Sequence, residues 1–169
     1  MAKPLRGLLI ALLIAALLGA GTWWLLAQPQ PQPGTEESSA HYLLQKQMAD
    51  VSSVMVQNRH GSYTVTQTAN GVTVHDLPPQ LVNLEYAAML LDECSSILYT
   101  ETVDENPADL APYGLQEPEA TVDIAYADGS GLRLLIGAQE PVSGQRYFKT
   151  AAGDAVLLMK NNRTIRFTM

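Results

Sequence analysis

A long uncharged apolar run near the N-terminus divides this chain into parts that must fold in different surroundings. Residues 7–27 contain no charged side chain. A helix of this length spans roughly 30 Å at about 1.5 Å per residue, which matches the hydrocarbon core of a bilayer. The run ends with a pair of tryptophans, which are enriched at membrane interfaces. We therefore expect a transmembrane anchor, whose characteristic residues include Leu8, Leu18, Trp23, Trp24 and Leu26.

The charges that flank the run predict its orientation. Lys3 and Arg6 precede it, and the next cation is Lys46. By the positive-inside rule, residues 1–6 are cytoplasmic and everything beyond the run is extracytoplasmic, which makes this a single-pass protein of the cell membrane. The alternative is a secretory signal that is cleaved near the small residues 19–21, which would release the protein. The length of the run favours the anchor.

A linker rich in proline and glutamine follows the run. Residues 28–40 begin with the sequence QPQPQPG, in which alternating proline favours an extended, semi-rigid spacer. Residues 41–169 are then long enough for one extracytoplasmic domain of ordinary size. We expect the folded part to begin near Tyr42.

The part beyond the run is acidic and offers few groups for chemistry. It holds eight cations and seventeen acids, a formal charge of −9, and this disfavours nucleic acid as a partner. Cys94 is the single cysteine, so no intramolecular disulfide can form. The histidines are not at metal-ligand spacing, and Ser130 lies in a predicted hairpin turn rather than in a nucleophile elbow. We expect no catalytic residue, no cofactor and no metal site.

Apolar residues first alternate with period two and then recur with the period of a helix. Val54 and Val56 belong to the first strand of a predicted three-stranded antiparallel meander, whose second turn is Asn70-Gly71, a strong hairpin signal. A helix is predicted over residues 80–97. Its expected apolar face consists of Leu81, Leu84, Ala87, Ala88, Leu91, Cys94 and Leu98.

The sequence pattern of the second half of the chain predicts further hairpins. Residues 102–118 are rich in Pro, Asp and Glu, and we expect a short helix or irregular connector that ends at Gly114. Alternating strands follow around the turn at residues 128–131 and the turn at Gly153-Asp154, and Ile165 with Phe167 would add a last strand. The prediction is an α+β fold with a mostly antiparallel sheet, built from a β-meander, one amphipathic helix and further β-hairpins, and preceded by one N-terminal transmembrane helix.

One group of residues has a distinctive spacing without any reactive side chain that the spacing requires. Gly114 is expected to stop the connector with a positive φ, Leu115 to enter the core, and Pro118 to fix the start of the next strand. Gly137 and Gly144 are expected to be turn residues. The full structural motif is Tyr113, Gly114, Leu115, Pro118, Gly137, Gly144 and Tyr147.

At these residues the chain resembles the bacterial family known as domain of unknown function 4340 (DUF4340). The resemblance extends over most of residues 51–159 and also includes the N-terminal anchor, the Asn70-Gly71 turn and the Asp128-Gly129 hairpin. It implies an envelope protein with a single anchor, and some members are linked to transporter-associated or gliding-motility-type systems. The resemblance assigns no catalytic residues to this chain. Many relatives continue beyond this length, so the resemblance leaves two alternatives, a complete member of the family or the N-terminal portion of one.

These observations lead to one expected function and one alternative. The expected function is a non-enzymatic, membrane-anchored extracytoplasmic interaction or accessory domain beside a transport or gliding-type envelope complex, with the membrane and an envelope or transporter protein as partners. The alternative is a cell-surface hydrolase or ligand-binding module that uses the acidic connector 104–113, including Asp104, Asp109 and Tyr113.

Overall fold

The structure is a computed structural model, and it describes residues 40–160 of the chain. The predicted anchor at residues 7–27, most of the linker and the last strand expected at Ile165 and Phe167 lie outside the described residues. Within residues 40–160 every helix is too short or too polar to cross a membrane. The first strand, β1 (His41–Gln45), begins next to Tyr42, where the folded part is expected to start.

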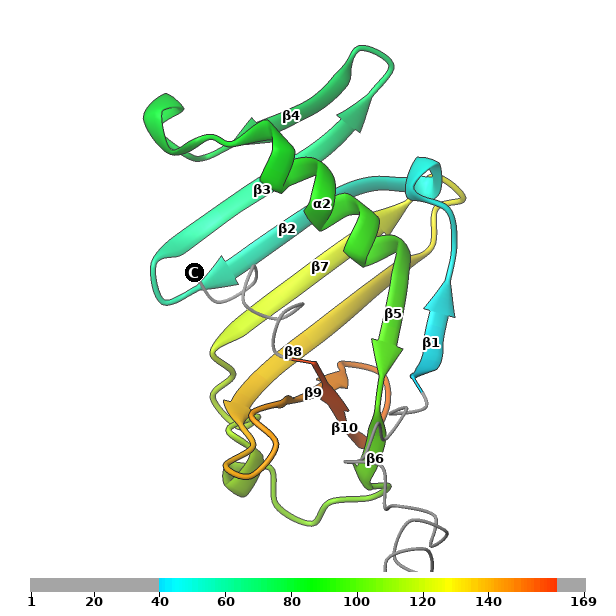
Figure 1. Cartoon of the computed structure of the whole chain (residues 1–169), viewed down its shortest axis with the longest axis vertical. Helices are drawn as coiled ribbons and strands as arrows, with labels where there is room; N and C mark the ends of the chain where they lie inside the picture. The colour runs from blue at the N-terminus through cyan, green and yellow to red at the C-terminus, as the bar shows by residue number, and fades with distance from the viewer. Residues whose placement is uncertain (1–39, 161–169) are drawn as a thin grey trace, which may run out of the picture. The chain divides into compact units, whose positions relative to one another are not determined.

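Eight strands form one antiparallel sheet in the order β4–β3–β2–β7–β8–β9–β10–β6 (Figure 1). The predicted meander is confirmed, since β2, β3 and β4 pair as neighbours with unbroken register between β3 and β4. The strands are β2 (Val51–Asn58), β3 (Gly61–Thr68), β4 (Gly71–His75), β6 (Glu101–Asp104), β7 (Ala120–Tyr126), β8 (Gly131–Gln139), β9 (Arg146–Thr150) and β10 (Val156–Met159).

The helix, α2 (Leu84–Ser95), is shorter at both ends than the predicted range of residues 80–97. At its start, Pro79–Leu81 forms the 3₁₀ turn η2, and the side chain of Asn83 then caps the helix by accepting from the backbone N–H groups of Glu85 and Tyr86. At its end, the chain becomes β5 (Ser96–Tyr99), which pairs with β1. The helical prediction is wrong at both ends of the range. Before Leu84 the Asn83 cap begins the helix, and after Ser95 the backbone groups bond to β1 instead of continuing the helix.

The predicted apolar face of the helix is correct in its middle and wrong at its N-terminal end. Ala87, Leu91 and Cys94 are buried as expected. Leu81 and Leu84, however, are 65% and 56% exposed, because Leu81 belongs to η2 and Leu84 is the first helical residue. Of these two residues, Leu81 also lines the groove described below.

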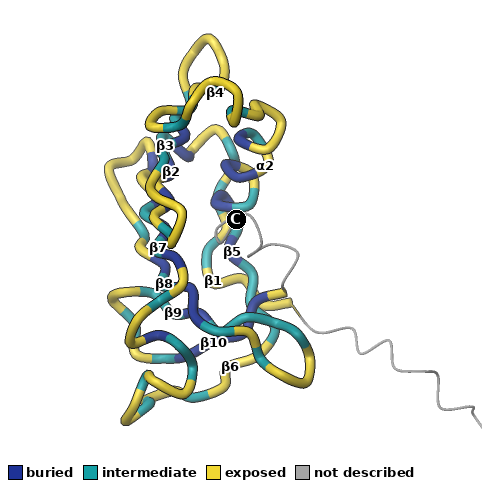
Figure 2. Tube along the Cα trace, turned by 90° about the vertical axis from the view of Figure 1, so that its left-hand side faces the viewer, coloured by how far each residue is buried: buried dark blue, intermediate teal, exposed yellow. Residues whose placement is uncertain are grey.

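Helix α2 and the β1–β5 pair cover one face of the eight-stranded sheet (Figures 1 and 2). The core lies between these layers, where the buried faces of neighbouring strands meet the buried stripe of α2. Its largest fully buried side chains include Leu91, Ile97, Leu134, Ile136 and Phe148. The described part is therefore an α+β fold with a mostly antiparallel sheet, as the sequence predicts.

Candidate functional site

A groove of about 810 Å³ lies where the N-terminal half of α2 approaches strands β3 and β4. The β2–β3 turn, the two strands, residues 76–83 and the helix all contribute to its lining. Most of the lining is apolar, with Tyr63, Val65, Val74, Leu77, Leu81 and Leu90 among its members. This arrangement suits an apolar segment or ligand, because pockets that bind such groups are concave and mostly apolar.

The rim of the groove carries exposed apolar side chains. Leu81 and Tyr86 both line the groove and are 65% and 56% exposed. Leu84 and Met89 of α2 are exposed too, but they do not line the groove. Single exposed apolar residues are ordinary, but several beside a concavity indicate a surface that binds another group. Leu81, which the sequence analysis assigned to the buried face of the helix, is thus part of this surface.

Asn83, Asp76 and Tyr63 are among the residues of the groove that carry polar groups. Asn83 caps α2 from within the lining. Asp76 adopts a positive φ of 67°, which Asp tolerates better than most residues, at the point where the chain leaves β4. Burial raises the pKa of Tyr63 to about 12, so its phenol stays protonated at neutral pH. The phenol of Tyr63 is thus a neutral hydrogen-bonding group in the groove.

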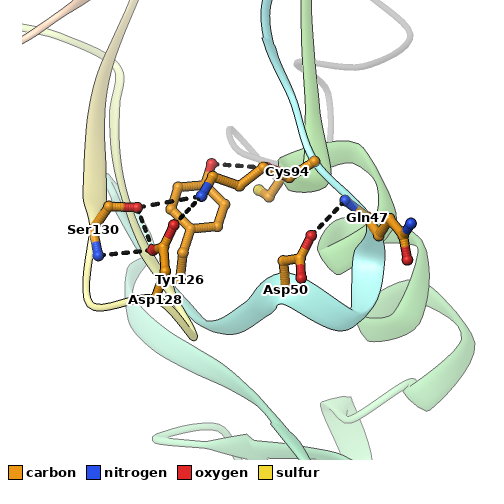
Figure 3. Close-up of polar contacts among 7 residues, drawn as sticks. Gln47, Asp50, Cys94, Tyr126, Asp128 and Ser130 are labelled. Atoms are coloured by element: carbon orange, nitrogen blue, oxygen red, sulfur yellow. Dashed lines mark hydrogen bonds and ion pairs between the residues drawn. The ribbon is translucent and has the colours of Figure 1, made fainter.

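A second candidate is a polar cluster that joins the segment after β1 to the β7–β8 turn (Figure 3). The Lys46 ammonium lies 2.5 Å from Asp128 Oδ2 and 3.4 Å from Ser130 Oγ, and it also stacks over the Tyr126 ring at 4.6 Å from the centroid. Ser130 Oγ donates to Asp128 Oδ1 at 2.5 Å. Tyr126 completes the cluster by donating its hydroxyl to the carbonyl of Cys94 at 3.1 Å.

The chemistry of this cluster favours a structural clamp over a nucleophile. Lys46 is paired with a carboxylate and acts as a donor, so it is not placed to take a proton from Ser130. Hydrogen bonds from Lys46 and Ser130 hold the pKa of Asp128 well below its usual range, which keeps the carboxylate charged. Burial raises the pKa of the Cys94 thiol, as expected for a buried and unreactive cysteine.

The third candidate is the structural motif of residues 113–147 that the sequence analysis predicts. Most of its residues lie beside one another where the turn before β7 meets strands β8 and β9. The 3₁₀ turn η3 (Ala111–Tyr113) ends at Gly114, which has the expected positive φ of 65°. Leu115 then enters the core with 2% exposure. The rings of Tyr113 and Tyr147 meet edge to face, with centroids 5.2 Å apart.

The glycines of this motif have different roles. The prediction that Gly137 is a turn residue is wrong, because it lies within β8, where the Tyr113 carbonyl packs directly against its Cα. Gly144 does lie in the loop between β8 and β9, with a φ of 70°, and its carbonyl accepts from Gln139 Nε2 at 2.9 Å. Pro118 precedes β7. Gly144 and Pro118 thus flank the cluster as loop residues.

Arg146 is a member of this cluster that the sequence analysis missed. Its Nη1 donates to Glu119 Oε2 at 2.6 Å and to the carbonyl of Gly137 at 3.1 Å. It therefore ties β9 to β8 and to the start of β7. The partner Glu119 lies 27 residues away in the sequence, and no local pattern signals such a pairing.

The acidic connector supplies loop caps. Asp104 accepts from the backbone N–H of Asn106 at 3.0 Å and from the Tyr113 hydroxyl at 3.3 Å. Asp109 accepts from the N–H of Ala111 at 2.9 Å at the start of η3. Burial, and then the neighbouring Asp104 charge, raise the pKa of Tyr113. Within residues 40–160, no group of three or more His, Cys, Asp or Glu is placed to hold a metal ion.

These features define a small α+β domain in which one helix and a strand pair cover a long antiparallel sheet. The chain belongs to the family described as "Domain of unknown function (DUF4340)", whose model matches residues 66–168. The match begins within β3 and extends past β10, so it includes the groove-forming helix and the contact between the Tyr113 carbonyl and Gly137. Searches of curated proteins and of solved structures gave no match.

Proposed function

We propose that this chain is a membrane-anchored extracytoplasmic interaction module whose partner binds at the groove between α2 and strands β3 and β4. The observation that carries the proposal is the apolar groove with Leu81 and Tyr86 exposed at its rim. Surfaces of this kind bind apolar groups of other molecules. The uncharged run of residues 7–27 supports the anchor, and the Pro/Gln-rich linker would hold the domain off the membrane.

The proposed partner is an envelope or transporter protein. A partner in or beside the same membrane fits a domain held close to the membrane by a short linker, because tethering raises the effective concentration of the two proteins. The acidity of the domain argues against nucleic acid as the partner.

The test compares two apolar-to-acidic substitutions in the full-length chain. Leu81→Glu places a carboxylate at the groove rim, and Val142→Glu is the matched control in the β8–β9 loop, where Val142 is 93% exposed. Both changes should cost little folding energy, because both side chains are exposed. Each protein is recovered by affinity from native membranes after mild crosslinking, and the bound proteins are quantified by mass spectrometry.

We expect an envelope or transporter protein to be recovered with the wild type and with Val142→Glu. Its recovery should fall about tenfold or more with Leu81→Glu, because an unpaired charge in an apolar contact costs well over 1.4 kcal/mol. Recovery of the protein alone, or equal recovery with both variants, would contradict the proposal.

We propose, as a second candidate function, a cell-surface hydrolase or ligand-binding module whose site uses the acidic connector, residues 104–113. It rests on one observation, the hydrogen bond between Tyr113 and Asp104, which places a phenol next to a carboxylate. The full-length protein would be screened against envelope polymers and divalent metals. Loss of turnover or binding in Asp104→Asn would support this function, and the absence of both in the wild type would remove it.

A further inference from the structure

The two edge strands of the eight-stranded sheet differ in their chemistry. Among residues 40–160, β4 pairs with β3 alone at one edge, and β6 pairs with β10 alone at the other (Figure 1). β6 begins with Glu101 and ends with Asp104, and its register with β10 shifts between Val156 and Leu157. Charges and irregular register are devices by which natural sheets keep an edge strand from pairing with another chain. The β6 edge is therefore protected.

Strand β4 lacks these devices. Its sequence, Gly71–His75, contains no Asp, Glu, Lys, Arg or Pro, and it pairs with β3 in unbroken register. The stretch without a charged residue covers residues 60–75, although residues 40–159 contain five cations and fifteen acids. An uncharged and regular edge strand is suited to pairing with a further strand.

The two faces of β4 define what kind of strand can join it. Val72 and Val74 pack against the core, whereas Thr73 is exposed on the other face, where it lies opposite Thr66 of β3. A strand that continues the sheet must place apolar side chains on the first face and uncharged polar ones on the second. β4 itself has this alternation in both chain directions, since valines lie on each side of Thr73.

We propose that β4 pairs antiparallel with β4 of a second copy of this chain, about a two-fold axis at Thr73. In this register Thr73 lies opposite Thr73 of the second copy, and Val72 lies opposite Val74. Threonine pairs stabilise antiparallel sheets, and the valines extend the apolar face across the junction. Asp76 falls opposite Asn70, so no like charges oppose one another there.

The symmetry of this pairing favours a second copy over a strand from another protein. A two-fold interface uses the same surface of both copies, so the β4 edges cover each other and association stops at two. The edges left at the two ends of the combined sheet are then both β6, the protected strand. The expected anchors would also hold the copies in one membrane, which raises their effective concentration. This inference goes beyond the proposed function, because it concerns the sheet edge and not the partner of the groove.

The first test is disulfide formation between full-length chains in membranes, with the single substitutions Thr73→Cys, His75→Cys and Thr102→Cys. All three residues are exposed, and Thr102 is the control on the β6 edge. Opposite residues of an antiparallel pair have Cα atoms roughly 4.5 to 5.5 Å apart, which a disulfide can bridge. His75 is the register control, since it falls opposite Gly71, and the two substituted positions would lie about 13 Å apart along the strands.

We expect Thr73→Cys to give at least about fivefold more disulfide-linked dimer than either control, because only its two sulfurs are within bonding reach. Similar yields from the three proteins would indicate random collision and overturn the inference. Coverage of the β4 edge by another protein, or by residues of the same chain outside the described range, would leave Thr73→Cys without an excess and overturn it too.

The second test measures the mass of the purified full-length protein in detergent by analytical ultracentrifugation. Thr73→Lys places two ammonium groups opposite each other at the axis, and Thr102→Lys is the matched control on the other edge. We expect dimers for the wild type and Thr102→Lys and monomers for Thr73→Lys, with circular dichroism confirming that all three are folded. A monomeric wild type, or dimers in all three proteins, would overturn the inference. No groove partner is present, so the outcome does not depend on the proposed function.

Discussion

Gly137 sets the distance between β8 and the turn that precedes β7. A Cβ atom at this position would lie 2.3 Å from the Tyr113 carbonyl oxygen and 3.0 Å from Leu115 Cγ. The oxygen belongs to the backbone and cannot rotate away as a side chain would. The absence of a side chain at residue 137 therefore permits the close approach that buries Leu115.

Replacement of Gly137 tests this contact. We expect Gly137→Ala to lower the free energy of unfolding by about 1–3 kcal/mol, the usual range for overpacking. Gly131→Ala is the control in the same strand, where the nearest atom to a new Cβ is the Ile124 carbonyl at 3.3 Å. Urea unfolding monitored by circular dichroism gives both values. Similar losses in the two variants would refute a specific role for the Tyr113 contact.

Asp128 makes the stability of the clamp depend on pH. Its pKa in the folded protein is held below the usual value of about 4 by hydrogen bonds from Lys46 and Ser130. A carboxyl group with a lowered pKa stabilises the fold above its unfolded pKa, and this contribution is lost as the pH falls through the folded pKa. The stabilisation should be complete at neutral pH.

The comparison of wild type with Asp128→Asn measures this dependence. We expect the wild type to be the more stable protein at pH 7, and the difference between the two to shrink as the pH falls below about 4. Urea unfolding at a series of pH values tests the prediction. A difference that stays constant down to pH 3, or that grows on acidification, would show that the carboxylate is not the source of the effect.

At the scale of secondary structure, the start of α2 depends on a single capping side chain. Asn83 Oδ1 accepts from Glu85 N–H at 3.0 Å and from Tyr86 N–H at 3.2 Å. The cap separates η2 from the helix and leaves Leu81 outside it. The capping residue therefore also determines the shape of the groove rim.

We expect Asn83→Ala to lower the free energy of unfolding by about 1 kcal/mol, which is typical for loss of an N-cap. Asn83→Asp should restore most of the stability, because an aspartate caps equally well. Thermal unfolding of the three proteins provides the measurement. If Asp destabilises as much as Ala, the contribution of Asn83 comes from its packing in the groove rather than from capping.

Elements with local signals could be predicted from the sequence, and those with distant partners could not. Alternation around the Asn70-Gly71 turn predicts the meander, and the motif before Gly114 predicts its positive φ. Residues 96 and 97 were predicted as helix, however, because the strand with which they pair, β1, lies more than fifty residues earlier in the chain. Lys46 and Asp128 are 82 residues apart in the sequence, and no local sequence pattern predicts that they pair. The groove was missed for the same reason, since its lining comes from segments that meet only in the fold.

At the scale of the whole molecule, the chain combines an expected anchor, a spacer and the described domain. The N-terminal prediction is tested by fractionation of cells that express the full-length chain. We expect the protein to stay in the membrane fraction even after a high-salt wash. Salt weakens attraction between charges, whereas residues 7–27 would be held in the bilayer by their apolar side chains. A variant that lacks residues 1–27 should fractionate with soluble proteins.

The mass of the intact recovered protein distinguishes the anchor from a cleaved signal. A mass that includes residues 1–27 supports the anchor, whereas a mass lacking about twenty N-terminal residues supports cleavage. A full-length mass found only in the soluble fraction would contradict both interpretations.

The position of β1 has a mechanical consequence for a tethered protein. Any tension along the linker enters the domain at His41, and β1 pairs with β5 alone among the described strands. β5 leads directly into β6, an edge of the eight-stranded sheet, and Lys46 follows β1 at once with its salt bridge to the β7–β8 turn. A pull from the membrane side would thus load a five-residue strand first and the Lys46–Asp128 pair next, before it reached the main sheet. The domain would yield in stages, beginning with the β1–β5 pair, which has four paired residues and lies outside the eight-stranded sheet.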